Sequence, residues 1–383
     1  MKINHKLWVL FGLAVTASPT QAQSSVTLFT SLDDAIAHYN NEGKGPVTQL
    51  QVGDMTGNWW GLRGEEDLGG GVKTVFFLAS GFNLNTGKQA IAGQEFGKAL
   101  GAWMGLASDS WGTVRIGRQY SPANDLVPGL TGDPYSPAFS TPGDADNNDG
   151  TFYVNNAVKY ISPNYDGFKY ELLYALGGVA GNISSQSSSS AAVSYSTGVL
   201  TVAGGYIFAK NDGPNGAGTA DQTQNNSVTP LFGDVPFVGS RLISMVAAQY
   251  NFGPFIGSLR YSNAQWKPGA KFTAFNRTET FNVGGVSLNY ALTFAAGLVF
   301  GYNYTKSSGA SAATYNTVAA QVYYHLSKRT TVYAVTAWNH ANGTTFSADG
   351  NSIVPAAGSL TDIAASSSTP NQVGFLLGMT THF

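Results

Sequence analysis

The chain has 383 residues, of which 11% are charged, and its formal net charge at pH 7 is −2. Ordinary soluble domains carry about 25% charged residues, so this composition is unlike that of a water-facing protein. The near balance of charge gives no support to nucleic-acid binding, and the absence of cysteine excludes a disulfide scaffold and thiolate chemistry.

The first 22 residues have the pattern of a secretory signal peptide. Two lysines precede an apolar run that ends at Ala17, and a small-residue cleavage site ends at Ala22. The alternative, a membrane anchor, needs about 20 apolar residues, which is more than this run provides. We therefore expect residues 1–22 to be cleaved and residues 23–383 to form the mature protein.

After the signal, the chain is built from segments of roughly 10 residues in which apolar and polar side chains alternate, as in half-buried strands. In one of them, Val318, Val322 and Tyr324 share a face and Gln321 lies on the other. In chain order the segments are 25–39, 55–66, 72–84, 96–107, 111–120, 151–162, 168–176, 191–195, 199–209, 242–251, 255–262, 281–290, 293–306, 314–326, 330–338 and 372–383.

These segments favour a membrane barrel over the alternative, an exported soluble β-protein. The chain holds 22 Phe and 19 Tyr, and several aromatic residues stand near strand ends, where they suit the two membrane interfaces. No apolar segment reaches the length of a spanning helix. An exported, charge-poor chain without such a helix predicts a closed antiparallel transmembrane β-barrel of about 16 strands, in one domain.

Residues 121–150 form a loop that does not fit this rhythm. The loop contains five Pro, four Gly, five Asp and neither Lys nor Arg, a composition that excludes a regular helix or strand. A loop of this length inside a compact fold is usually functional or disordered. Because an alternating segment flanks the loop on each side, we expect the loop to be functional and not disordered.

Several motifs resemble those of Gram-negative general porins of the β-proteobacterial type. Residues 60–71, WGLRGEEDLGGG, are similar to the family signature WGLRGSEDLGGGL. Further similar stretches are SSVTLF at 24–29, SGFN at 80–83, GRQY at 117–120, PGDADN at 142–147 and NNAVKY at 155–160. The last residue, Phe383, matches the terminal aromatic that the outer-membrane barrel-assembly machinery reads in this family. The matches follow the family order over the whole mature chain.

The resemblance implies a fold, a location and partners. It implies a 16-stranded barrel that spans the outer membrane of a Gram-negative bacterium, forms a homotrimer and contacts outer-membrane lipid. The third extracellular loop, here 121–150, would fold into the lumen and narrow it. The protein would be a water-filled channel for passive diffusion of ions and small hydrophilic solutes, with no cofactor.

The resemblance also implies a charged constriction. The acids of the loop would be Asp125, Asp133, Asp144 and Asp146. In the family these groups face arginines on the opposite wall, and the field between them sets ion selectivity, since screening is weak where water is scarce. The basic residues left for that wall in this chain are Arg63, Lys98, Arg115 and Lys159.

The chain departs from the family pattern at the wall. Trp59, Leu100 and Tyr153 stand where the family has arginines, and Phe77-Leu78-Ala79 stands where it often has Gln-Leu-Glu. One interpretation is a general diffusion porin with neutral substitutions. The other is a channel for cations or for flat, partly apolar or aromatic solutes, because aromatic faces attract cations and stack on rings. Our hypothesis is that Asp144 and Asp146, with no facing arginines, favour cations.

Enzymatic motifs are absent from the sequence. There is no G-x-S-x-G elbow, H-E-x-x-H or P-loop, and the five His are scattered, so we expect neither catalysis nor a metal site. A barrel-type hydrolase is a remote alternative. Its only neighbourhood with suitable residue types is His340 with Ser347 and Asp349.

Overall fold

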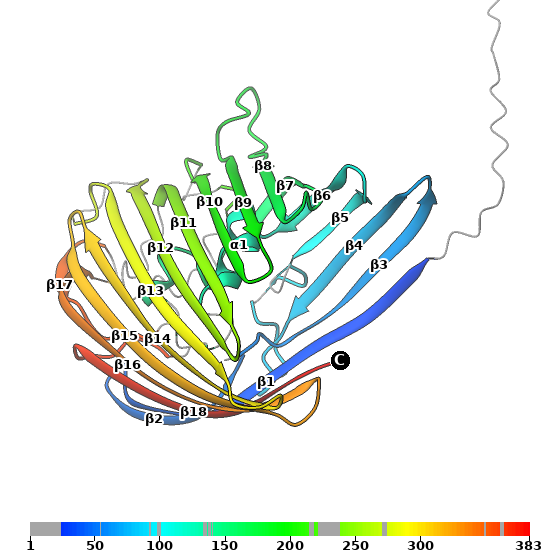
Figure 1. Ribbon diagram of the computed structural model, residues 1–383. Coiled ribbons are helices and arrows are strands. Elements are labelled where there is room, and N and C mark those ends of the chain that lie inside the picture. Colours follow the sequence, from blue (N-terminus) through cyan, green and yellow to red (C-terminus); the bar gives the residue numbers. More distant parts are fainter. Residues whose placement is uncertain are drawn as a thin grey trace, which may run out of the picture.

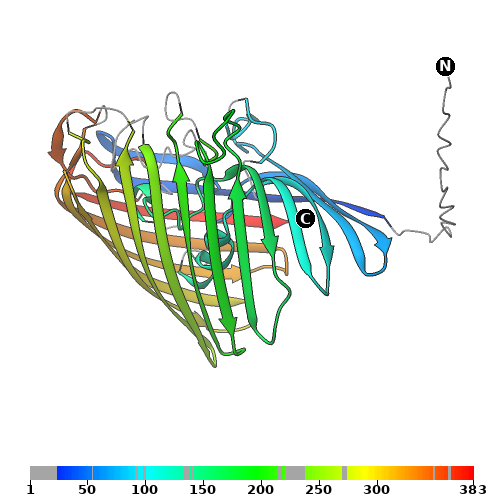
Figure 2. The same ribbon diagram turned by 90° about the horizontal axis from the view of Figure 1, so that it is seen from above.

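The fold is known from a computed structural model, which describes residues 24–53, 55–91, 93–97, 101–132, 136, 139, 141–213, 218–220, 238–269, 274–347, 350–360 and 364–383. The predicted signal peptide lies outside these ranges. Within them, no helix is long and apolar enough to cross a membrane. The fold is a single antiparallel sheet whose strands run side by side around a ring (Figures 1 and 2).

The sheet closes on itself, since β1 pairs with β18 from Ser31 opposite His382 to Tyr39 opposite Gly374; Figure 1 shows these blue and red strands side by side. The strands are β1 (Ser25–Glu42), β2 (Gly45–Val52), β3 (Trp59–Gly69), β4 (Val72–Gly81), β5 (Ala102–Ser108), β6 (Gly112–Gln119), β7 (Val154–Ile161), β8 (Phe168–Ala175), β9 (Ser188–Ser196), β10 (Leu200–Lys210), β11 (Val238–Phe252), β12 (Phe255–Pro268), β13 (Glu279–Ala291), β14 (Ala296–Ser308), β15 (Ala312–His325), β16 (Thr330–Phe346), β17 (Ile353–Pro355) and β18 (Asn371–His382).

The described strands fill 16 positions around the barrel. β2 and β3 pair with successive parts of β1, on the edge opposite β18, and together fill one position. β17 pairs only with the end of β16, outside the ring. The prediction of a 16-stranded antiparallel barrel is therefore confirmed.

Side chains alternate between the two faces of the sheet. On β15 the outward Val318 and Val322 are each 46% exposed, whereas the inward Thr317 and Gln321 are 2% and 3% exposed. This is the alternation that the sequence predicted for the segment. An apolar outer band and a polar interior suit a barrel in lipid, because the outward side chains then meet hydrocarbon.

Several strands extend outside the predicted segments, and the two longest additions are residues 45–52 and 339–346. β2 was missed because Gly45 and Pro46 begin it and Gly53 follows it, and these residues are typical of turns. Residues 339–346 continue β16, although Asn342 and Gly343 favour a loop. Pairing with a neighbouring strand overrides the local preference in both places.

The lipid-facing side of the barrel can be tested at Val318, in the middle of β15. We expect Val318→Arg to lower the free energy of unfolding in a bilayer by about 2–4 kcal/mol, because a charge near the midplane is poorly solvated. Equilibrium unfolding in liposomes measures the change. Val318→Leu should leave the stability within about 0.5 kcal/mol. Equal stability of the arginine variant and the parent would contradict the assigned face.

Candidate functional site

The 121–150 loop folds back onto the inner face of the barrel. It begins with α1 (Pro122–Leu126), where the Ser121 Oγ accepts a hydrogen bond from the Asn124 amide at 3.3 Å. Such a cap satisfies a donor that the helix leaves free. α1 packs against β8, β9 and β10 and lies within the ring of strands in Figure 1. The expected position of the loop in the lumen is therefore confirmed.

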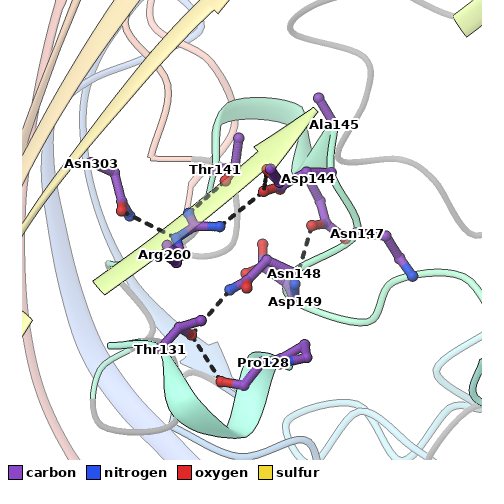
Figure 3. A network of polar contacts seen from close by, with 12 residues as sticks. Pro128, Thr131, Thr141, Asp144, Ala145, Asn147, Asn148, Asp149, Arg260 and Asn303 are labelled. Carbon is purple, nitrogen blue, oxygen red and sulfur yellow. Dashed lines mark hydrogen bonds and ion pairs between the residues drawn. The ribbon is translucent and has the colours of Figure 1, made fainter. Parts of the chain in front are cut away.

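Arg260 of β12 is the main polar anchor of the loop. Its Nη1 lies 2.9 Å from the Asp146 Oδ2, and its Nη2 donates to the Thr141 Oγ1 at 2.8 Å. Figure 3 shows the side chain extending toward the loop between Thr141 and Asn303. Ser262 also donates to Asp146. The Arg260 and Asp146 side chains are only 6% and 1% exposed, so each depends on the other for charge compensation.

Two glycines on the wall leave room for these contacts. A Cβ at Gly301 of β14 would lie 2.2 Å from a ring carbon of Phe139, and a Cβ at Gly285 of β13 would lie 2.9 Å from the Arg260 Nε. Both distances are shorter than the non-bonded contacts that a Cβ atom makes in proteins. The loop is held close to β13 and β14 because these positions carry no side chain, and Asn303 then donates to the Phe139 carbonyl.

Asp144 shapes the loop from inside. Its carboxylate accepts hydrogen bonds from the Asp149 and Thr151 amides at 3.1 and 3.2 Å, and its φ is 41°. The side chain is fully buried. Burial, and next the negative charge of Asp146, hold the pKa of Asp144 well above its ordinary value. Asp144 is thus a structural residue of the turn and does not face water.

Lys159 of β7 compensates the charge at the beginning of the loop. It forms an ion pair with Asp125 and lies 3.8 Å from Glu171 of β8. It also donates to the Tyr120 carbonyl at 3.1 Å, and its side chain is 1% exposed. Lys159 therefore fastens the loop and leaves little charge for the lumen.

Two further segments fold inward. Residues 55–58, between β2 and β3, lie over Asp33, which accepts hydrogen bonds from the Met55 and Thr56 amides at 3.1 Å each. After β17, the Leu360 amide donates to the inward-facing Gln372 at 2.7 Å. Both segments narrow the interior from the side of β1 and β18.

The inner wall of β1, β3, β4 and β5 carries four neighbouring rings, which we call the aromatic wall: Phe29, Trp59, Phe77 and Trp103. Phe29 lies 5.3 Å from Trp59 and 5.1 Å from Phe77, between ring centroids. Phe77 stacks on Trp103 at 5.6 Å with an angle of 11°. These three ring contacts join the four side chains into one continuous surface.

Two arginines flank the aromatic wall. The Arg63 guanidinium lies 5.6 Å from the Phe29 centroid and Arg115 of β6 lies 3.9 Å from the centroid of Trp103. Arg63 is exposed and Arg115 is partly buried. Among the residues the structure describes, neither forms an ion pair with a carboxylate. The wall therefore combines apolar faces with positive charge.

The structure distributes the predicted site residues over three places. Trp59, Phe77, Arg63 and Arg115 come together on the aromatic wall. Asp125, Asp144, Asp146 and Lys159 hold the loop. Tyr153 stacks on Tyr120 at 4.3 Å, and the two hydroxyls are 2.7 Å apart, at the foot of the loop. Asp133, Lys98 and Leu100 lie outside the described residues.

The expectation that no arginine faces the loop acids is wrong, because Arg260 pairs with Asp146. The sequence did contain a signal: Leu259 and Tyr261 face outward, so alternation turns Arg260 inward. Phe29 and Trp103 were missed as well. Their inward parity was readable, but their proximity depends on the register of β1, β3, β4 and β5.

The residues considered for a hydrolase do not form a catalytic group in the described ranges. His340 lies 2.9 Å from the Asn371 Oδ1 and stacks on Trp338, and Asp349 lies outside those ranges. Over the same part of the chain, no group of three or more His, Asp or Glu side chains could hold a metal ion.

A closed 16-stranded barrel, narrowed by a loop that is anchored to its inner wall, defines a transmembrane β-barrel protein of the outer membrane. A sequence profile described as Gram-negative porin matches residues 10–344. The chain therefore belongs to the Gram-negative porin family, as the motifs indicated, and its location is the outer membrane.

Two curated relatives agree with this assignment. An outer membrane porin protein of Bordetella pertussis is 34% identical over 186 residues, which cover 43% of this chain and 46% of that protein. Outer membrane porin protein 32 of Delftia acidovorans is 28% identical over 263 residues, which cover 64% of this chain and 66% of that protein. The matched region thus spans less than two thirds of each relative.

Solved structures share the fold. An anion-selective porin from Comamonas acidovorans superposes with a TM-score of 0.72 and 21% identity, over 94% of this chain and 100% of that chain. A trimer form of OmpT from Vibrio cholerae has a TM-score of 0.63 and 16% identity, over 94% of this chain and 99% of that chain.

The Arg260 anchor gives a test of loop docking. Arg260→Gln removes one partner of a buried ion pair, a change that costs about 3–5 kcal/mol. We expect the loop to detach more often, so that protease cleaves it at least about tenfold faster in the folded, detergent-solubilised protein. Limited proteolysis with mass spectrometry measures the rate and the position of cleavage.

The matched control is Arg277→Gln, at an arginine that is exposed and donates to the Gly309 carbonyl. This variant should be cleaved at the parent rate. If Arg260→Gln and the parent were cleaved equally fast within 121–150, the anchor would have no role in docking.

Proposed function

We propose that the protein is a channel for the passive diffusion of ions and small hydrophilic solutes across the outer membrane. The observation that carries this proposal is the water access of inward charged side chains on the wall opposite the loop. Glu65 and Lys73 face the interior and form an ion pair at 3.1 Å, with side chains 49% and 48% exposed, and the inward Arg63 is also exposed. A wet, charged interior suits a pore.

Charge compensation in the interior supports a weak preference for anions. Asp146 and Asp125 are paired with Arg260 and Lys159, and Asp144 is buried. On the aromatic wall, Arg63 and Arg115 have no ion pair within the described ranges. The exposed arginine of the wall opposite the loop, Arg63, therefore supports a weak anion preference over the cation preference that the sequence suggested.

A second candidate function is a more selective channel for partly apolar or aromatic solutes. The aromatic wall favours it, because rings that line a pore interact with flat solutes. Diffusion through a pore accounts for the whole structure without enzymatic activity, and we expect none.

We further propose that the protein forms a homotrimer and that the barrel-assembly machinery recognises Phe383. The trimer form of the Vibrio cholerae neighbour supports the first point. For the second, Phe383 is 63% exposed, while its amide donates to Thr30 of β1 and its carbonyl accepts from the same residue. The terminal ring is thus available although its backbone belongs to the sheet.

Ion selectivity follows from the reversal potential of single channels in a KCl gradient. We expect an open channel that favours chloride weakly, and Arg63→Ala should shift the reversal potential toward potassium because it removes an exposed positive charge. Lys44→Ala, in the turn between β1 and β2, is the control and should not shift it. A parent channel with clear potassium preference would refute the charge assignment, and no conductance would refute the pore.

A role of Phe383 in recognition by the assembly machinery can be distinguished from a role in folding. Phe383→Ala should lower the amount of folded barrel in the outer membrane several-fold, because the assembly machinery reads an exposed ring. Refolding of the purified variant into detergent should match the parent, since the ring makes few contacts. A heat-modifiable gel band quantifies both, and equal amounts in cells would disprove the recognition role.

A further inference from the structure

The aromatic wall has the properties of a binding surface as well as those of a channel lining. Its four rings lie on adjacent barrel positions, at centroid distances of 5.1 to 5.6 Å. Neither buried apolar cluster that holds the inward loops includes any of them. Trp59, Phe77 and Trp103 keep part of their surface in contact with water. Packing alone does not account for rings in this position.

The positions of the two arginines restrict the kind of ligand. Arg63 lies directly across the strand pair from Phe77, and Phe77 lies across from Trp103. A small ring placed against Phe77 and Trp103 therefore has Arg63 on one side. On the other side, Arg115 covers the face of Trp103, and its buried Nε has no hydrogen-bond partner in the described part of the chain.

Negative charge near the wall is engaged elsewhere. Asp125 and Glu171 act electrostatically on Arg115, and both lie beside Lys159. Glu65 pairs with Lys73. Arg63, which is exposed and has no ion pair among the described residues, is thus available for a carboxylate, to which arginine binds through two parallel hydrogen bonds.

We propose that the aromatic wall is a weak binding site for small aromatic monocarboxylates. The ring of the solute meets the water-accessible parts of Phe77 and Trp103 edge-to-face, because Phe77 and Arg115 already lie against the Trp103 ring. Its carboxylate binds the exposed Arg63. This inference rests on the proposed channel function and specifies a solute class for it. A single aromatic contact of this kind is weak, so the site slows passage of such solutes without trapping them.

The test compares two probes that share charge and size. Benzoate and cyclohexanecarboxylate each carry one carboxylate on a six-carbon ring, and only benzoate is aromatic. In planar bilayers at neutral pH, we expect benzoate to reduce the KCl current by half at a concentration about fivefold lower than cyclohexanecarboxylate. Equal concentrations for the two probes in a channel with normal KCl conductance would overturn the proposal.

Variants of the aromatic wall test whether the difference between the two probes arises there. Phe77→Leu and Trp103→Leu keep an apolar side chain and should abolish the difference between the probes. Arg63→Gln should weaken both probes alike, because it removes charge and leaves the rings. Tyr323→Leu is the matched control, since Tyr323 is an inward ring on β15, away from the wall, and should preserve the difference. A parent-like ratio in both leucine variants of the wall would place the binding elsewhere.

The outcomes separate the two proposals. Normal KCl conductance with equal inhibition by the probes rejects the binding site and leaves the channel function intact. Absence of KCl conductance rejects the channel function, and the inference about the aromatic wall falls with it. A difference between the probes that requires Phe77 and Trp103 supports both.

Discussion

The pairing of backbone groups inside the bilayer is the constraint on which the rest of the structure depends. Hydrocarbon offers no partner for a free amide or carbonyl, so a spanning sheet must close. Here the closure is the pairing of β1 with β18, at opposite ends of the chain. Once the ring is closed, alternation divides the side chains between lipid and lumen. Charged side chains such as those of Arg260 and Asp33 can then point only into the interior of the barrel.

Inside the ring, charge matching determines where the long loop lies. The loop carries five Asp and no Lys or Arg, and a buried carboxylate is costly without a cation or hydrogen-bond donors. Lys159 and Arg260 supply the cations, and they stand on β7 and β12. The loop therefore covers that side of the lumen. The opposite side keeps its arginines and its rings in contact with water.

Glycines, which carry no side chain, are as important as charges for this difference between the two sides of the lumen. Gly301 makes room for Phe139 beneath the loop, and a Cβ at Gly61 would lie 2.6 Å from a ring carbon of Phe29 on the aromatic wall. Glycine is normally unfavourable inside a strand, and one of its uses there is a close approach. In this barrel, glycines set both how deeply the loop sits and how the first ring of the aromatic wall lies.

From sequence alone, alternation with a period of two and the absence of a spanning helix predicted a barrel of about 16 strands. The resemblance of the motifs, such as the one at 60–71, implied the family and the inward position of the loop. Alternation and motifs are local properties, which a linear chain displays. The partners of the loop acids were decided only by the tertiary structure. Arg260 and Asp146 are separated by 114 positions, and Phe29 meets Phe77 and Trp59 only through strand register. Register and docking arise when distant segments pack together, so single residues could be assigned a face, whereas their partners across the lumen could not be read from the chain.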